Sequence, residues 1–256
     1  MEWLDRFVQV MDVLSSREYC RGIGITDLSE KTEISKSTLH RMLQNMSDQK
    51  LVIQNAETRK YELGPRSMMW GSQFIRSRNI DGILSRYCRM LADDTGLYSF
   101  LCRFSGDQVY CIAVKQPREE NHMYFVNIGQ VMPWHCSACA KAILAFQSPE
   151  YINCILAKEK KVYTEYTITE PERLKDELRT VRQRGIAWCN EEMEYHVAAA
   201  GVPLLFHGEG AVFSLGFVGN DTFIKEHRSK LESVLLKWGS LAGKELSLAR
   251  ELTGII

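Results

Sequence analysis

Apolar residues recur at helical spacing through the first fifty positions of the chain. Residues 3–15 place an apolar side chain at every third or fourth position, which predicts an amphipathic helix. A second, short helix is expected to start at Thr26 or Asp27, either of which would cap it, and to end near Glu33. A third helix is expected over 36–49, with its apolar stripe facing the core.

After the third helix the pattern changes to short strands. The segments 51–54 and 60–63 flank a polar turn and predict a small β-hairpin, which Gly64-Pro65 ends. A helix, a short helix, a helix and a hairpin in this order predict a winged helix-turn-helix domain over residues 1–65.

The remaining residues predict a second lobe. Helices are expected over 66–78 and 80–94, and we interpret 66–79 as a linker helix between the lobes. Strand-like segments follow at 97–104, 109–114, 123–128, 186–189, 198–206 and 211–218. Further helices are expected at 137–146, 149–157, from Glu170-Pro171 to before Gly185, and from a cap at Asp221 to about residue 248. Residues 80–256 are therefore expected to form an α+β domain with an antiparallel sheet.

Charge does not by itself identify a nucleic-acid partner. The 256 residues have a formal net charge of zero. The first 70 positions hold ten Lys or Arg against ten Asp or Glu. A DNA-binding surface must therefore depend on where the cations lie and not on their sum.

The start of the third helix carries the side chains best suited to DNA. It offers hydroxyl groups and cations, while Leu39, Met42 and Leu43 face the core. The hairpin tip adds two cations on an exposed wing. The predicted DNA-binding residues are Thr26, Ser35, Lys36, Ser37, Thr38, His40, Arg41, Arg59 and Lys60. The alternative interpretation is the solvated polar face of an ordinary three-helix bundle.

Several blocks of sequence resemble the IclR family of bacterial transcription regulators. SKSTLHR at 35–41 and YELGPR at 61–66 are similar to the family in the first lobe. In the second lobe, CSACAKAILA at 136–145 is similar to the family's HATALGKALLA stretch, and 163–185 to its charged helix. CNEE at 189–192 is similar to its DDEE turn. The blocks occur in family order over nearly the whole chain.

The resemblance implies both an architecture and partners. The second lobe would be a GAF-like effector-binding domain, and the protein would be a homodimer, often a tetramer, that pairs through the N-terminal part and the linker helix. It would bind a near-palindromic operator in double-stranded DNA, and a small organic effector would modulate that binding. The resemblance implies no enzymatic activity and no cofactor.

The resemblance also implies an effector pocket, which in this chain is mostly apolar. The corresponding residues are Met132, Trp134, Ala138, Cys139, Cys189, Val197, Ala199, Gly216 and Val218. A compact, highly charged ligand would lose its hydration there without compensation. We therefore expect an aromatic or hydrophobic carboxylic acid and not glyoxylate or pyruvate. The alternative is that these residues are simply core and that ligand control has been lost.

A rival hypothesis concerns thiols. Cys136 and Cys139 form a Cys-x-x-Cys beside His135, and Cys189 could join them through the fold, which would suit a redox sensor, an enzyme or a metal site. No second ligand pair accompanies them, so buried, reduced thiols and no metal are the favoured expectation. The acidic run 191–194 is expected to be a solvated or capping turn.

The chain shows no targeting signal. It begins without a basic region and an apolar run, and no apolar stretch approaches the ~20 residues that span a bilayer. A cytoplasmic protein without a membrane partner is expected.

Overall fold

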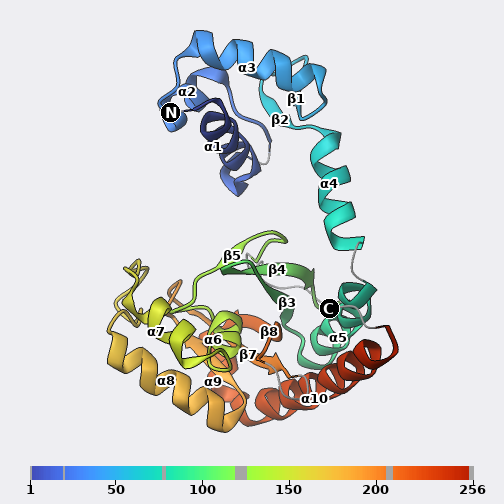
Figure 1. Ribbon diagram of the computed structural model, residues 1–256, viewed down its shortest axis with the longest axis vertical. Coiled ribbons are helices and arrows are strands. Elements are labelled where there is room, and N and C mark those ends of the chain that lie inside the picture. The colour runs from blue at the N-terminus through green and yellow to red at the C-terminus, as the bar shows by residue number, and fades with distance from the viewer. Residues whose placement is uncertain (1, 20, 77–78, 119–125, 206–209, 254–256) are drawn as a thin grey trace. The chain divides into compact units, whose positions relative to one another are not determined.

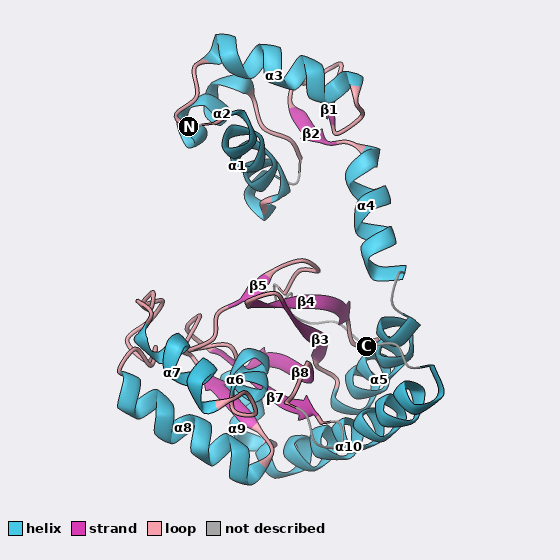
Figure 2. Cartoon of the chain, viewed as in Figure 1, coloured by secondary structure: helices cyan, strands magenta, loops and turns pink. Residues whose placement is uncertain are grey.

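The computed structural model describes residues 2–19, 21–76, 79–118, 126–205 and 210–253 (Figures 1 and 2). The chain divides into two compact units, Met1–Ser77 and Arg78–Ile256. Each has its own buried core, and each is described separately below.

The N-terminal unit holds the predicted helices and hairpin. Its elements are α1 (Trp3–Ser15), a 3-10 turn (Arg17–Tyr19), α2 (Ile25–Thr32), α3 (Lys36–Asp48), β1 (Val52–Gln54), β2 (Tyr61–Leu63) and α4 (Pro65–Arg76). The strands pair antiparallel, with Val52 opposite Leu63. This order is the winged helix-turn-helix that the sequence predicts.

The core of this unit follows the helical periodicity. Val10 of α1, Leu28 of α2 and Leu39 and Leu43 of α3 are buried in one cluster. The prediction for the start of α2 is wrong, because Gly24 occupies the N-cap and no side chain caps the helix. Thr26 and Asp27 lie instead inside its first turn.

The C-terminal unit is an α+β domain around one antiparallel sheet. Its strands are β3 (Tyr98–Ser105), β4 (Gln108–Lys115), β5 (Val131–Met132), β6 (Ala187–Asn190), β7 (Val197–Leu204) and β8 (Phe213–Asn220). They lie in the order β5-β4-β3-β8-β7-β6. Its helices are α5 (Asn79–Thr95), α6 (Ala138–Leu144), α7 (Pro149–Ala157), α8 (Pro171–Arg184), α9 (Asp221–Glu226) and α10 (Arg228–Thr253).

Helices cover both faces of this sheet (Figure 1). On one face α5 and α10 contact the strands, and on the other α6 contacts β7 and β8 and in turn carries α8. Strand β7 shows the two faces by alternation: Ala198 and Ala200 join the cluster under α5 and α10, while Ala199 joins the cluster under α6. The small residues allow the helices to approach the sheet closely.

Two predictions for this unit need correction. Of the third predicted strand, 123–128, residues 123–125 lie outside the described residues, and the described part, 126–128, is a loop that leads to β5 and not a strand. The final helix is capped by Asn220, whose Oδ1 accepts the N–H of Thr222 at 3.1 Å, and not by Asp221. It is also interrupted at His227, which separates α9 from α10.

Among the described residues, no helix combines the length and apolar character needed to cross a membrane.

Candidate DNA-binding surface and effector pocket

The start of α3 is fixed by its own hydroxyl groups and by its buried face. The Ser35 side chain caps the helix: its Oγ accepts the Thr38 N–H at 3.4 Å and donates to Thr38 Oγ1 at 2.9 Å. On the opposite side of the helix, Leu39 and Leu43 are fully buried. The N-terminal turn of α3 is therefore held rigidly with its polar side toward solvent.

The residues predicted to bind DNA lie at the surface of the N-terminal unit. Thr38 is half-buried, and the others are exposed, namely Thr26, Ser35, Lys36, Ser37, His40, Arg41, Arg59 and Lys60. Within the described part of the chain, neither Lys36 nor Arg41 has an ion-pair partner. Their charges are thus available to an external anion.

The wing is ordered by one asparagine. Asn55 Oδ1 accepts the N–H groups of Glu57 and Thr58, each at 3.0 Å, and Gln54 Nε2 donates to the Arg59 carbonyl at 2.9 Å. Arg59 itself has a φ of 59°, in the left-handed region. This tight turn displays the cations of Arg59 and Lys60 at the end of the hairpin.

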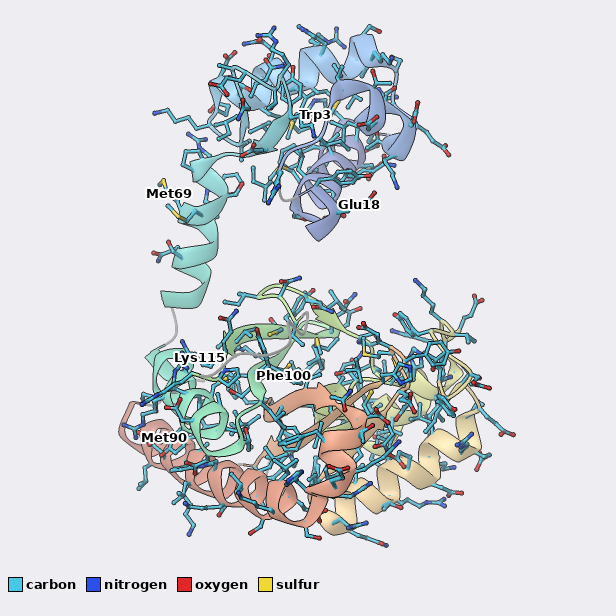
Figure 3. All side chains as sticks on the ribbon, turned by 180° about the vertical axis from the view of Figure 1, so that it is seen from behind. Trp3, Glu18, Met69, Met90, Phe100 and Lys115 are labelled. Atoms are coloured by element: carbon cyan, nitrogen blue, oxygen red, sulfur yellow. The ribbon has the colours of Figure 1, made fainter. Side chains whose placement is uncertain are left out.

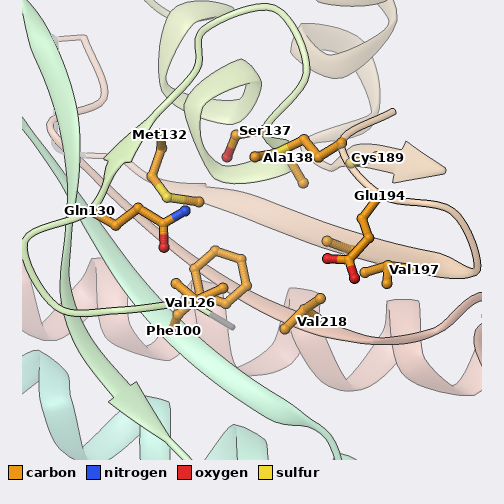
Figure 4. A pocket seen from close by; sticks show the side chains of 12 residues that line it. Phe100, Val126, Gln130, Met132, Ser137, Ala138, Cys189, Glu194, Val197 and Val218 are labelled. Atoms are coloured by element: carbon orange, nitrogen blue, oxygen red, sulfur yellow. The ribbon is translucent and has the colours of Figure 1, made fainter. Parts of the chain in front are cut away.

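The C-terminal unit contains a cavity between the sheet and the start of α6 (Figure 4). Its floor is a row of neighbours across three strands, in which Ala199 pairs with Cys189 on one side and with Val218 on the other. The twelve lining residues are Phe100, Val126, Gln130, Met132, Ser137, Ala138, Cys189, Met193, Glu194, Val197, Ala199 and Val218. The cavity volume is about 80 Å³.

Of the residues predicted for the effector pocket, six line this cavity, namely Met132, Ala138, Cys189, Val197, Ala199 and Val218. Trp134 does not, because its ring packs edge-on against Phe104 and Tyr151, and its N–H donates to the Asp107 carbonyl at 3.3 Å.

Cys139 and Gly216 lie beside the cavity and do not line it, since Cys139 belongs to α6 and Gly216 to the sheet beneath that helix. A Cβ on Gly216 would come within 2.8 Å of Cys139 Sγ and within 2.5 Å of the Ala200 carbonyl oxygen. The two residues therefore form the close contact between α6 and the sheet. Their role is to seat α6.

Sequence analysis missed the polar part of the lining. Gln130, Ser137 and Glu194 point into the cavity (Figure 4). Gln130 follows a segment that was predicted to be a strand. Glu194 is exposed, as expected for a solvated turn, but it also lines the cavity, which the sequence did not indicate. The described lining contains no Lys, Arg or His, so the carboxylate part of the predicted ligand finds no counter-charge there.

Within the acidic run 191–194, Glu192 does not fit the expectation of a solvated turn. This side chain is buried, and its Oε1 accepts from Lys141 Nζ at 2.7 Å. Lys141 is fully buried, and its second carboxylate partner is Glu177 of α8, at 3.3 Å. The turn after β6 is thereby tied to α6 and α8.

The surroundings of Cys136 and Cys189 do not favour the hypothesis of a reactive thiol centre. Burial raises the pKa of Cys136 above its ordinary value and that of Cys189 to about 12, so the nucleophilic thiolate is disfavoured. Cys154 departs from the expectation of buried thiols, since it is exposed. In the residues that the structure describes, no group of three or more His, Cys, Asp or Glu side chains could hold a metal ion.

Comparison with known proteins identifies both units. The model of the bacterial transcriptional regulator IclR C-terminal domain matches residues 72–240, and the model of the IclR helix-turn-helix domain matches residues 4–56. The acetate operon repressor of Salmonella typhimurium is 28% identical over 230 residues, which cover 89% of this chain and 82% of that protein.

Solved structures share the fold. An IclR transcriptional regulator from Alicyclobacillus acidocaldarius has a TM-score of 0.80 at 21% identity, covering 94% of this chain and 97% of its own. An IclR homolog from Microbacterium hydrocarbonoxydans, solved in complex with 4-hydroxybenzoate, has a TM-score of 0.79 at 17% identity, with 97% and 100% covered. The chain belongs to the IclR family of bacterial transcriptional regulators, which are DNA-binding proteins and not enzymes.

Proposed function

We propose that this regulator binds operator DNA as a dimer in the bacterial cytoplasm and that a small organic effector changes its affinity for the operator. The observation that carries the DNA-binding part is the start of α3, where exposed Lys36 and Arg41 have no ion-pair partner among the described residues. Such a helix start fits the major groove, with hydroxyl groups and cations facing phosphates and base edges.

The double variant Lys36→Ala, Arg41→Ala tests this surface. We expect operator affinity, measured by fluorescence anisotropy at fixed salt, to fall by at least tenfold, because two phosphate or base contacts are lost. The control is Lys31→Ala, since Lys31 lies in α2 and faces Glu18 at 3.7 Å. Unchanged specific binding by the double variant would refute the assignment.

Apolar side chains on two helices of the N-terminal unit support the dimer. Trp3 and Leu4 of α1 are each 60% exposed, and Met68, Met69 and Trp70 of α4 are exposed as well. Figure 3 labels Trp3 and Met69 among them. Surfaces of this kind usually contact another protein. A second copy would place two α3 helices about one DNA turn, ~34 Å, apart to read a two-fold operator.

Analytical ultracentrifugation of Trp70→Glu tests the dimer. A charge within the apolar face would shift the protein toward monomer, whereas Gln73→Glu, at a polar exposed position of the same helix, would not. Retention of the full oligomer by Trp70→Glu would exclude this face. The same measurement distinguishes a dimer from a tetramer.

The cavity under α6 supports an effector with a largely apolar body. Phe100, Met132 and Val218 give it apolar walls, and a related fold binds 4-hydroxybenzoate. A sealed cavity that holds benzene measures about 150 Å³, so the side chains of Met132 and Met193 would have to shift to admit a ring. Methionine is suited to this because it is unbranched and flexible.

Thermal shift with a panel of aromatic and aliphatic compounds tests the effector part. A true effector would raise the melting temperature and also change operator affinity. The variant Ala199→Phe, which fills the floor, would lose both responses.

A further inference from the structure

The cavity is distinguished by an unpaired negative charge. Glu194 is exposed to solvent, and it is the one charged side chain among the described lining residues, with its carboxylate pointing into the cavity (Figure 4). It has no ion-pair partner within the described residues. This contrasts with its neighbours in the acidic run, since Glu192 pairs with Lys141 and Glu191 accepts the His196 N–H at 2.9 Å.

The opposite side of the cavity offers neutral hydrogen-bonding groups. Ser137 is only 2% exposed, and its Oγ has no hydrogen-bond partner within the described residues. Gln130 Oε1 already accepts the Asn127 N–H at 3.0 Å, which leaves its Nε2 as a donor. A buried hydroxyl without a hydrogen-bond partner lowers the stability of the fold. A ligand atom that forms a hydrogen bond with Ser137 Oγ therefore gains binding energy.

The walls between these ends are apolar. Phe100 presents its ring to the cavity beside Val126 and Val218 (Figure 4). A ligand that fills the space must therefore be apolar in the middle, neutral and polar near Ser137, and complementary to a carboxylate near Glu194. A ligand carboxylate at the Glu194 end would meet a like charge without any described cation to offset it.

Resting on the effector function proposed above, we propose that the ligand is a small aromatic or aliphatic amine. Its ammonium group pairs with Glu194, its body lies against Phe100, and a hydroxyl or carbonyl at its far end reaches Ser137 Oγ and Gln130 Nε2. Glu194 is thus the residue that determines the charge of the effector. The ligand is bound without any covalent bond to the protein.

Two compounds of similar size and opposite charge test the proposal on the full-length protein. Both 4-hydroxybenzylamine and 4-hydroxybenzoate carry a phenol on one ring, but at neutral pH the first is a cation and the second an anion. By isothermal titration calorimetry, we expect the amine to bind wild type at least about fivefold more tightly, because the exposed Glu194 carboxylate attracts the cation and repels the anion. Glu194→Gln should bring the two dissociation constants within about twofold of each other.

Two further variants separate charge selection from general damage. Glu159→Gln, an exposed acid after α7 that lies outside the lining, should keep the full preference for the amine. Ser137→Ala should weaken both compounds by a similar factor, because the phenol is common to them. A variant that lost binding through misfolding would instead show a changed circular dichroism spectrum.

Each remaining outcome has a defined meaning. Tighter binding of 4-hydroxybenzoate, or an amine preference that survives Glu194→Gln, overturns the assignment of Glu194 and leaves the effector function standing. The absence of any binding by both compounds at millimolar concentration overturns the amine proposal. If the wider compound panel also fails to bind, the effector function is lost with it.

Discussion

Lys141 Nζ lies 2.7 Å from Glu192 Oε1 in a part of the C-terminal unit where both side chains are buried. The pair joins α6 to the turn that follows β6. Glu177 of α8, which is partly exposed, adds a second carboxylate to Lys141. Both the start of α6 and this turn contribute lining residues to the cavity, through Ala138 and Glu194. The ion pair therefore fixes the position of the start of α6 relative to the turn after β6, and these two segments form two walls of the cavity.

Removal of the Lys141 ammonium should destabilise the C-terminal unit strongly. Lys141→Met leaves the Glu192 carboxylate buried without its cation, which typically costs about 3–5 kcal/mol. Urea denaturation followed by circular dichroism measures the loss. Lys175→Met, which removes the cation of an exposed pair with Glu172 at 3.9 Å, should cost no more than about 0.5 kcal/mol. Adding Glu192→Leu to Lys141→Met should recover much of the loss, because no buried carboxylate is then left without a cation. If Lys141→Met were as stable as Lys175→Met, this account would be contradicted.

The same pair predicts a loss of stability at alkaline pH. Burial alone would lower the pKa of Lys141, but the carboxylates of Glu192 and Glu177 more than offset it and raise the pKa above its ordinary value of 10.5. Since the folded pKa is the higher one, the contribution is fully present below pH 10.5 and is lost as pH rises through the folded value. The difference in unfolding free energy between wild type and Lys141→Met should stay constant from neutral pH to about pH 9 and shrink above pH 10.5. If the difference in unfolding free energy stayed constant from neutral pH to well above pH 10.5, Lys141 could not be charged in the folded protein.

A methyl group at Gly201 should disturb the floor of the cavity. A Cβ there would lie 2.8 Å from the Cys139 backbone nitrogen, so α6 would have to move away from β7. We expect Gly201→Ala to cost about 1–3 kcal/mol and to weaken effector binding. Gly82→Ala is the matched control: a Cβ on this helical residue meets nothing within 4 Å, so the change should stabilise α5 slightly. If Gly201→Ala were as well tolerated as Gly82→Ala, the close contact would be wrong.

The wing should contribute to DNA affinity without selecting sequence. Arg59 is exposed at the hairpin tip, where it suits a phosphate. We expect Arg59→Ala to reduce the slope of log affinity against log salt by about 0.9, the value for one lost phosphate contact. The ratio of affinities for operator and unrelated DNA should stay unchanged. A fall in that ratio would show instead that Arg59 reads bases.

The predictability of each element depended on how local its determinants are. Helix α3 was predictable because Leu39, Met42, Leu43 and Met46 recur at helical spacing and are all buried. Helix α8 was predictable from its ends, since Pro171 starts it and Gly185 closes it with a φ of 72°. Both signals lie within a few residues of the structure that they specify.

The site was less predictable because it joins distant segments. Lys141 and Glu192 are 51 residues apart, and nothing local to either residue indicates that the other neutralises it. Glu194 gave no signal of its own inside a run of acids. The resemblance to a family supplied the floor residues, such as Ala199 and Val218, but not the polar side chains around them.

The tight seating of α6 on Gly201 and Gly216 has a consequence for how this regulator could diversify. Where a single methyl group meets backbone at 2.8 Å, few substitutions are tolerated. Gln130 and Glu194 lie on loops, where exchange displaces no packed helix. We expect related regulators to accept different effectors through substitutions in the loops around this cavity, whereas the two glycine positions under α6 stay unchanged.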